Sequence, residues 1–98
     1  MSREYTDRMK DKEKELERIL KALANRRRLG ILRVLKQNRE AAVGDIAAQI
    51  RLSFRSTSKH LGVLTAADIL EKDQRSLQMF YRIAEDLPDA ARRIIPLL

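Results

Sequence analysis

The stretch LSFRSTSKHLGVL, residues Leu52–Leu64, predicts a single helix with one apolar face and one cationic face. If Thr57 points inward, a turn of about 100° per residue places Leu61 and Leu64 on the same side. The opposite face and its flanks then carry Arg55, Lys59 and Gly62, with Ser56 and Ser58 beside them. The exposed stripe holds a guanidinium, an ammonium and hydroxyls but no carboxylate, a combination that suits phosphate oxygens and base edges.

The residues just before this helix predict a second, shorter helix over Val43–Ile50. Its apolar positions recur at helical spacing, at Val43, Ile46, Ala47 and Ile50. A short turn at Arg51 and Leu52 follows, and Ser53 supplies a hydroxyl that caps the next helix. Small Ala47 allows the two helices to cross closely, as a helix-turn-helix requires.

Two further helices are predicted nearer the N-terminus. Residues 1–10 are polar without a clear period and are expected to form a flexible arm, whereas residues 11–98 form one domain. From Asp11 onward a helix presents an apolar stripe at Leu16, Ile19, Leu20 and Leu23.

The next helix runs from Asn25 or Arg26 to Lys36 or Gln37. The cations at its start, Arg26, Arg27 and Arg28, oppose the helix dipole. They either reach DNA phosphates or form a merely exposed basic turn.

The C-terminal third predicts a β-hairpin and a last helix. Residues Ile69–Ile83 alternate as in a half-buried hairpin, with Leu77 inward and the tip at residues 73–76. Such a hairpin after a groove-reading helix is a wing, and Arg75 is its candidate DNA contact.

The last helix begins at Asp86 or Leu87 and ends near Pro96. We expect its apolar residues against the first helix of a second subunit, a lipid surface being the rival partner.

Composition is consistent with a nucleic-acid-binding protein. The chain has 98 residues and a formal net charge of +7, which favours a polyanionic partner. A chain this short buries only a modest core unless it shares surface with a second copy, so a dimer is expected. The absence of cysteine excludes disulfides and thiolate ligands and fits a cytoplasmic protein. No signal peptide and no membrane-spanning apolar run is found, so no membrane partner is expected.

Three segments together resemble the ArsR/SmtB family of winged-helix repressors. They are LKALANRRRLGILRVLK, DIAAQIRLSFRSTSKHLGVL and ILEKDQRSLQMFYRI, and the resemblance extends from Leu20 to Ile83. It implies a mainly α fold with a small β-hairpin, in the order of two helices, a helix-turn-helix, a wing and a final helix. It also implies a homodimer whose two recognition helices enter consecutive major grooves of an operator.

The chain departs from the metal-sensing members of this family. Their two cysteines are replaced by the run Ala42-Val43-Gly44, and of the paired Asp and His residues on the last helix only Asp89 is present. The sole histidine, His60, lies in the recognition helix. A zinc site needs three or four converging ligands, so neither a metal nor another cofactor is expected.

These observations predict a cytoplasmic, sequence-specific regulator of transcription, most simply a repressor, that binds double-stranded DNA as a homodimer. The expected DNA contacts are Arg55, Ser56, Ser58, Lys59, His60 and Arg75, with Arg51, Arg26 and Arg27 on the backbone. The expected dimer contacts are Leu16, Ile19, Leu20, Leu23, Ile94, Ile95 and Leu98.

The alternative function is that of a winged-helix module that binds an acidic protein. An enzyme is not expected, because the chain has no cysteine, no second histidine and no Gly-rich phosphate loop. The inducing signal stays open between an apolar ligand, another protein, a response to salt or temperature, and no signal at all.

Overall fold

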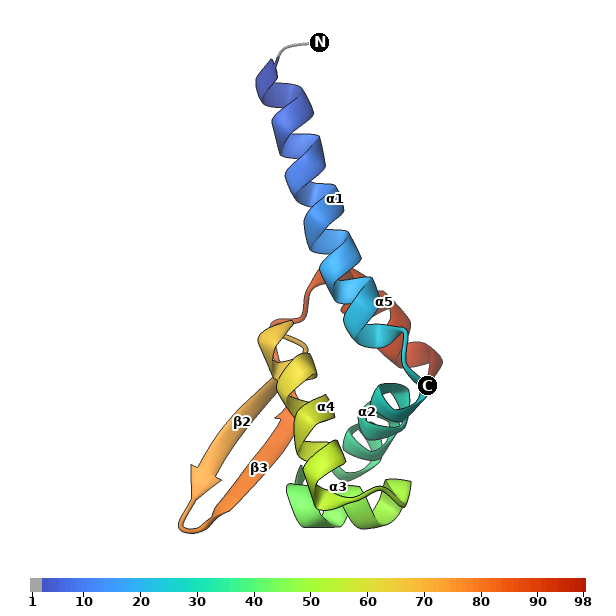
Figure 1. The fold of residues 1–98 in the computed structure, drawn as a ribbon, viewed down its shortest axis with the longest axis vertical. Coiled ribbons are helices and arrows are strands. Elements are labelled where there is room, and N and C mark those ends of the chain that lie inside the picture. The colour runs from blue at the N-terminus through green and yellow to red at the C-terminus, as the bar shows by residue number, and fades with distance from the viewer. Residues whose placement is uncertain (1–2) are drawn as a thin grey trace.

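A long first helix projects from a body made of the other helices and a small sheet (Figure 1). The computed structural model describes the backbone of residues 3–98 and the side chains of residues 7–98. Over this range the elements are α1 (Arg3–Leu23), α2 (Arg26–Asn38), β1 (Glu40–Ala42), α3 (Val43–Ile50), α4 (Phe54–Ala66), β2 (Leu70–Arg75), β3 (Gln78–Ile83), α5 (Asp89–Ile94) and a 3-10 turn, η1 (Ile95–Leu97). This order confirms the predicted winged helix-turn-helix.

Local capping defines where the central helices begin and end. The Asn25 side chain accepts a hydrogen bond from the backbone N–H of Arg28 at 3.1 Å, and α2 begins beside it. Ser53 caps α4 in the same way, accepting from the N–H of Ser56 at 3.1 Å. The predicted cap at Ser53 is therefore confirmed. After α3 the chain turns through Arg51, which has a left-handed φ of 55°.

The apolar face of α4 lies in the core, as predicted. Thr57, Leu61 and Leu64 are fully buried, and α4 packs on α2, α3 and β2. Ala47 of α3 is also buried, as the close crossing of α3 and α4 requires. Because these elements, together with α1, hold α4, its orientation is set by the body of the domain.

The wing belongs to a three-stranded antiparallel sheet in the order β1-β3-β2. The prediction of a hairpin alone missed β1, which pairs with β3. The predicted hairpin tip is also wrong, because Arg75 pairs with Gln78 and leaves Ser76 and Leu77 at the turn. The turn places Ser76 at a φ of 57° and leaves Leu77 exposed, rather than inward as expected.

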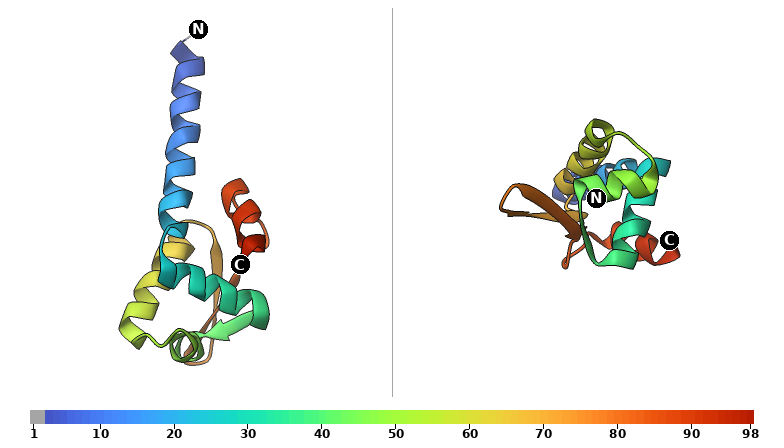
Figure 2. Two further views of the ribbon diagram at one scale, coloured as in Figure 1. Left: turned by 90° about the vertical axis from the view of Figure 1, so that its right-hand side faces the viewer. Right: turned by 90° about the horizontal axis from the view of Figure 1, so that it is seen from below.

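The two ends of the chain differ from expectation. Helix α1 begins at Arg3, so residues 3–10 continue the first helix instead of forming an arm, while residues 1 and 2 lie outside the described part. Helix α5 begins at Asp89, after Pro88, and η1 follows it. Figure 2 shows α5 beside the C-terminal half of α1, and the two helices contact each other within one chain.

This intrachain packing corrects part of the predicted dimer surface. Three of the predicted interface residues are buried in the subunit's own core, namely Ile19, Leu23 and Ile95. Ile94 and Leu98 are partly buried against that core. Leu16 and Leu20 remain exposed on α1. The apolar stripe of the first helix therefore divides into an inner row that holds the domain together and an outer row that stays uncovered.

Candidate nucleic-acid interface

The outward face of α4 is cationic and open. Arg55 and Lys59 are exposed, whereas Ser56 and Ser58 are half-buried on the flanks. The sequence has no aspartate or glutamate between Ile46 and Ala67, so this face carries positive charge without a neutralising carboxylate on α4. Gly62 also lies on this face, and a Cβ added there would meet nothing within 4 Å. The face can therefore approach an anionic surface closely.

Three other predicted cations lie near the turn between α3 and α4 or at the start of α2. Arg51 is exposed at the turn itself. Arg27 is exposed, and its Nη1 lies 3.5 Å from the carbonyl oxygen of Ile50, the last residue of α3. Arg26 is exposed at the start of α2. The fold thus brings Arg27 and Arg51, distant in sequence, to the same turn.

Arg28, the third arginine at the start of α2, has a structural role. Its guanidinium donates to the carbonyl oxygens of Ala22 at 2.6 Å and Lys21 at 3.1 Å, at the end of α1. Its Nη1 lies 3.2 Å from Nδ1 of His60 on α4. Arginine only donates, so Nδ1 of His60 accepts and its proton lies on Nε2. Arg28 therefore links α1, α2 and α4.

His60 is half-buried on the flank of α4 that meets Arg28. Burial lowers the pKa of His60 below its ordinary value of 6.5, and the nearby charges of Arg28, Arg27 and Lys59 lower it further. The ring is therefore neutral at neutral pH. His60 was predicted to face the groove, but the structure places its Nδ1 toward the body of the domain.

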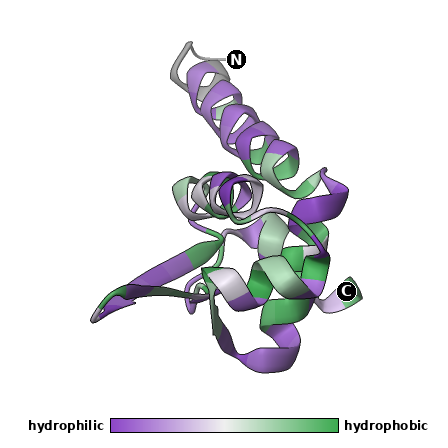
Figure 3. Cartoon of the chain, turned by 60° about the horizontal axis from the view of Figure 1, so that its bottom comes forward, coloured by the Kyte–Doolittle hydropathy of each residue, from purple (hydrophilic) through white to green (hydrophobic). Residues whose placement is uncertain are grey.

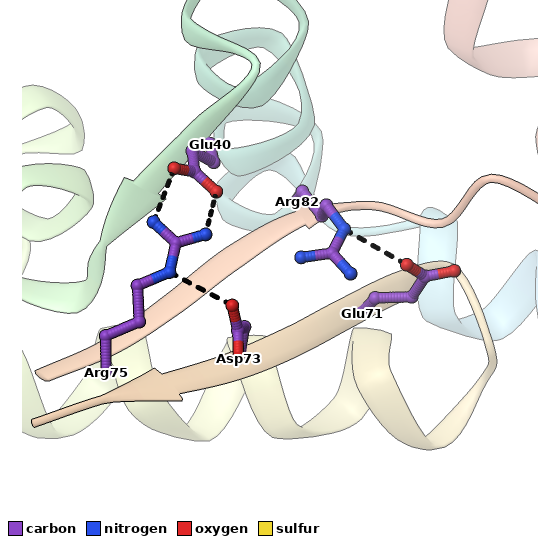
Figure 4. Close-up of polar contacts among 5 residues, drawn as sticks. All are labelled: Glu40, Glu71, Asp73, Arg75 and Arg82. Carbon is purple, nitrogen blue, oxygen red and sulfur yellow. Dashed lines mark hydrogen bonds and ion pairs between the residues drawn. The ribbon is translucent and has the colours of Figure 1, made fainter.

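Arg75 is tied into the sheet (Figure 4). Its two terminal nitrogens donate to the Glu40 carboxylate at 2.7 and 2.8 Å, and its Nε donates to Asp73 at 3.0 Å. The guanidinium also lies over the Phe80 ring, 4.7 Å from the centroid. These contacts lower the pKa of Glu40, chiefly through its hydrogen bonds with Arg75. The predicted wing contact is thus already paired with two carboxylates, although its side chain stays 46% exposed.

Two exposed apolar side chains were not among the predicted site residues. Phe54 opens α4 and is 63% exposed, and Leu77 forms the wing turn and is 97% exposed. No helical pattern indicated the exposure of Phe54, because it lies three residues before Thr57, about 60° away on the same side of the helix. Leu77 was misplaced because strand alternation was carried through the turn.

An uncovered apolar strip runs along α1. Leu16 and Leu20 are 48% and 42% exposed. They line a shallow trough together with Glu13, Glu17, Lys21 and Ala24. Figure 3 shows that the rest of the projecting helix is mainly hydrophilic.

The side chains described include no group of three or more His, Cys, Asp or Glu residues placed to hold a metal ion. No helix in the described range is long and apolar enough to cross a bilayer.

Comparison with known proteins agrees with this geometry. The model of a helix-turn-helix domain family matches residues 23–73. The biofilm growth-associated repressor of Agrobacterium fabrum is 37% identical over 86 residues, which are 88% of this chain and 71% of that protein.

Two solved structures are similar over most of the chain. A winged helix-turn-helix DNA-binding domain from Mycobacterium bovis, described as homodimeric, has a TM-score of 0.80 and 33% identity, covering 93% of this chain and 81% of that chain. Reduced HlyU from Vibrio cholerae has a TM-score of 0.77 and 30% identity, covering 93% of this chain and 92% of that chain. From its motifs, its fold and these relatives, the chain belongs to the ArsR family of winged helix-turn-helix transcriptional regulators.

Proposed function

We propose that this protein is a sequence-specific regulator of transcription that binds double-stranded DNA as a homodimer, with α4 in the major groove. The observation that carries this proposal is the open, carboxylate-free face of α4, where Arg55 and Lys59 are exposed. A major groove admits one α-helix, and its base edges lie within reach of such side chains. Repression is the proposed outcome, supported by the name of the A. fabrum relative.

Each cation has a proposed role according to its position. Arg55 lies near the start of α4, where recognition helices contact base edges. Its guanidinium can donate two hydrogen bonds to the O6 and N7 acceptors of guanine. Lys59, Arg51, Arg26 and Arg27 contact phosphates, which fixes register without reading sequence. Ser56 and Ser58 donate from the flanks. Arg75 orients the wing through Glu40 in place of contacting DNA directly.

The dimer is proposed to form through the outer row of α1. Leu16 and Leu20 supply an uncovered apolar strip with charged residues beside it. Ile94 and Leu98, which are partly buried near the C-terminus of the chain, are proposed to extend it. A two-fold pair of this kind presents both α4 helices to one face of a duplex, at half-sites about 34 Å apart.

We propose binding rather than catalysis as the activity. The sole histidine of the chain is engaged with Arg28, and the sequence has no cysteine nucleophile. A regulator of transcription acts where the DNA is, so we place this protein in the cytoplasm. No cofactor is part of the proposal, and the signal that releases it from DNA is an unidentified inducer.

The test is selection of operators from random duplex DNA, followed by binding measurements over a range of salt concentrations. We expect palindromic sites and a linear fall of log K with log salt. Lys59→Ala lowers the magnitude of the salt slope by about 0.9 for each phosphate that is no longer neutralised and weakens all sequences alike. Arg55→Ala instead relaxes discrimination at one base pair per half-site.

Lys14→Ala is the matched control, because it removes one exposed cation from α1, outside α4. It should leave both the slope and the discrimination unchanged. A flat salt response and no enriched operator would reject DNA recognition and favour the acidic-protein alternative.

A further inference from the structure

Phe54 is an exposed aromatic side chain that the fold does not use. It is 63% exposed and belongs neither to the hydrophobic core nor to the apolar residues packed against it. The start of α4 is already closed by Ser53, which accepts from the N–H of Ser56. By contrast, Phe80 lies under the Arg75 guanidinium and Tyr81 is buried. The ring of Phe54 is thus free to contact something outside the chain.

The surroundings of Phe54 are cationic. It is the first residue of α4 and lies next to Arg55 and three residues after Arg51, both exposed. At about 100° per residue, Phe54 and Ser58 lie roughly 40° apart on one flank of the helix. No carboxylate belongs to the sequence between Ile46 and Ala67. An apolar ring inside a cationic, acid-free surface suits a ligand with an anionic exterior and an apolar group within reach.

The DNA major groove offers such a ligand. Its rims are phosphates, and the single apolar group on its floor is the C5-methyl of thymine, a group that phenylalanine can contact. Residues at the N-terminus of a recognition helix are the ones that meet base edges. Phe54 occupies that position beside Arg55. An acidic protein surface would satisfy the cations but provides no defined apolar partner for this one ring.

We propose that Phe54 is a specificity-determining residue that packs on the C5-methyl group of a thymine next to the base read by Arg55. This inference rests on the proposed DNA-binding function and adds the identity of one recognised base. It implies that the preferred half-site contains an essential thymine whose methyl group, rather than its hydrogen-bonding edge, is read.

The test replaces each thymine of a selected operator with deoxyuridine, one symmetric pair at a time. This change removes only the methyl group and leaves every hydrogen-bonding atom in place. Loss of one buried methyl weakens binding about fourfold per half-site, hence roughly sixteenfold for a symmetric pair. We expect wild-type protein to show this loss at one thymine position. Phe54→Ala should bind the thymine operator correspondingly more weakly and show no further loss with deoxyuridine.

Val63→Ala is the matched control, since Val63 is another exposed apolar residue of α4, at 40% exposure, and lies nearer its C-terminus. This variant should keep the full deoxyuridine penalty. The inference is overturned if Phe54→Ala retains the wild-type penalty, or if no thymine position responds in the wild type while operator binding persists. It is also overturned if Phe54→Ala leaves operator affinity intact and instead abolishes binding to an acidic protein. If the wild type binds no duplex at any salt concentration, the proposed function itself fails.

Discussion

Arg28 and His60 form a contact that ties the cationic helix to the rest of the domain. Nη1 of Arg28 lies 3.2 Å from Nδ1 of His60, while the same guanidinium donates to two carbonyl oxygens at the end of α1. Those carbonyls would otherwise lack partners at the helix terminus. One side chain therefore caps α1 and holds α4, so that the outer face of α4 keeps its orientation relative to the helix proposed to dimerise.

This contact predicts a loss of stability in mildly acidic solution. The pKa of His60 is lowered in the folded protein by burial and by the neighbouring cations, so the unfolded chain binds the proton more readily. The stabilisation is present above the unfolded pKa of about 6.5 and is lost as the pH falls through the lowered folded pKa. Urea unfolding between pH 8 and pH 5 measures this change.

His60→Gln is the comparison for that experiment, because a glutamine side chain can still accept from Arg28 but does not titrate. The fall in unfolding free energy between pH 7 and pH 5 should be smaller in this variant than in the wild type. Equal falls in the two proteins would show that His60 does not cause the effect.

A second prediction concerns the wing. Glu40 engages both terminal nitrogens of Arg75, and Glu40→Gln removes that carboxylate. Asp73 still accepts from Nε of Arg75, but the two terminal nitrogens then face no carboxylate and can reach phosphate. Affinity for DNA of any sequence should therefore rise, and the salt slope should steepen by about 0.9 for each additional phosphate neutralised. Binding isotherms at several salt concentrations measure the slope. Arg75→Ala alone should not change it, and combining both substitutions should cancel the gain.

A third prediction concerns the buried hydroxyl of Thr57. In the described part of the chain its Oγ1 has no hydrogen-bond partner, although the side chain is fully buried. Thr57→Val keeps the shape and removes the unpaired polar group, and should raise the free energy of unfolding by about 1 kcal/mol. Urea unfolding with an unchanged m-value measures this.

The control for Thr57 is on the same helix. Thr65 donates its hydroxyl to the carbonyl oxygen of Leu61 at 2.8 Å. Thr65→Val removes a satisfied bond and should give no increase in stability. A comparable increase for both valine variants would mean that helix propensity or hydrophobicity, rather than the unpaired Oγ1, is responsible.

A fourth prediction separates stability from DNA binding at Gly62. A Cβ there meets nothing within 4 Å, so Gly62→Ala should stabilise the protein by about 0.5–1 kcal/mol through helix propensity. Because the added methyl stands on the face proposed to approach DNA, operator affinity should fall. Thermal unfolding and gel shift measure the two effects.

Gly30→Ala is its counterpart in α2, where an added Cβ would lie 3.7 Å from Cγ2 of Ile50, an ordinary contact. It should stabilise the domain without changing operator affinity. Unchanged affinity in Gly62→Ala would argue against a close approach of DNA at that position.

A fifth prediction tests the outer row of α1. Leu20→Glu places a charge in the apolar trough while leaving the buried Ile19 untouched. The variant should stay folded, elute as a monomer at concentrations where the wild type is a dimer, and bind operator weakly. Light scattering measures the mass. Lys14→Glu, on another face of the same helix, should remain dimeric, and a dimeric Leu20→Glu would place the interface elsewhere.

Local patterns in the chain were enough to specify the helices, their caps and the inward face of α4. Apolar spacing and capping residues act over one or two turns, so Val43–Ile50, the Ser53 cap and the burial of Thr57 and Leu61 could all be predicted from nearby residues. The same locality explains the failure at the hairpin tip, because Ser76 takes a positive φ without the glycine or asparagine that usually marks such a turn.

Tertiary packing was needed to establish which polar groups meet and which leucines stay uncovered. Arg28 with His60, and Glu40 with Arg75, are brought together by the packing of distant elements, and no periodicity within one element encodes such pairs. Likewise, Ile19 and Leu20 are sequence neighbours of similar hydrophobicity, yet one is buried and the other exposed. The reason is that α5 and the core cover one side of α1, and the relative placement of helices depends on the whole packed domain rather than on any single segment.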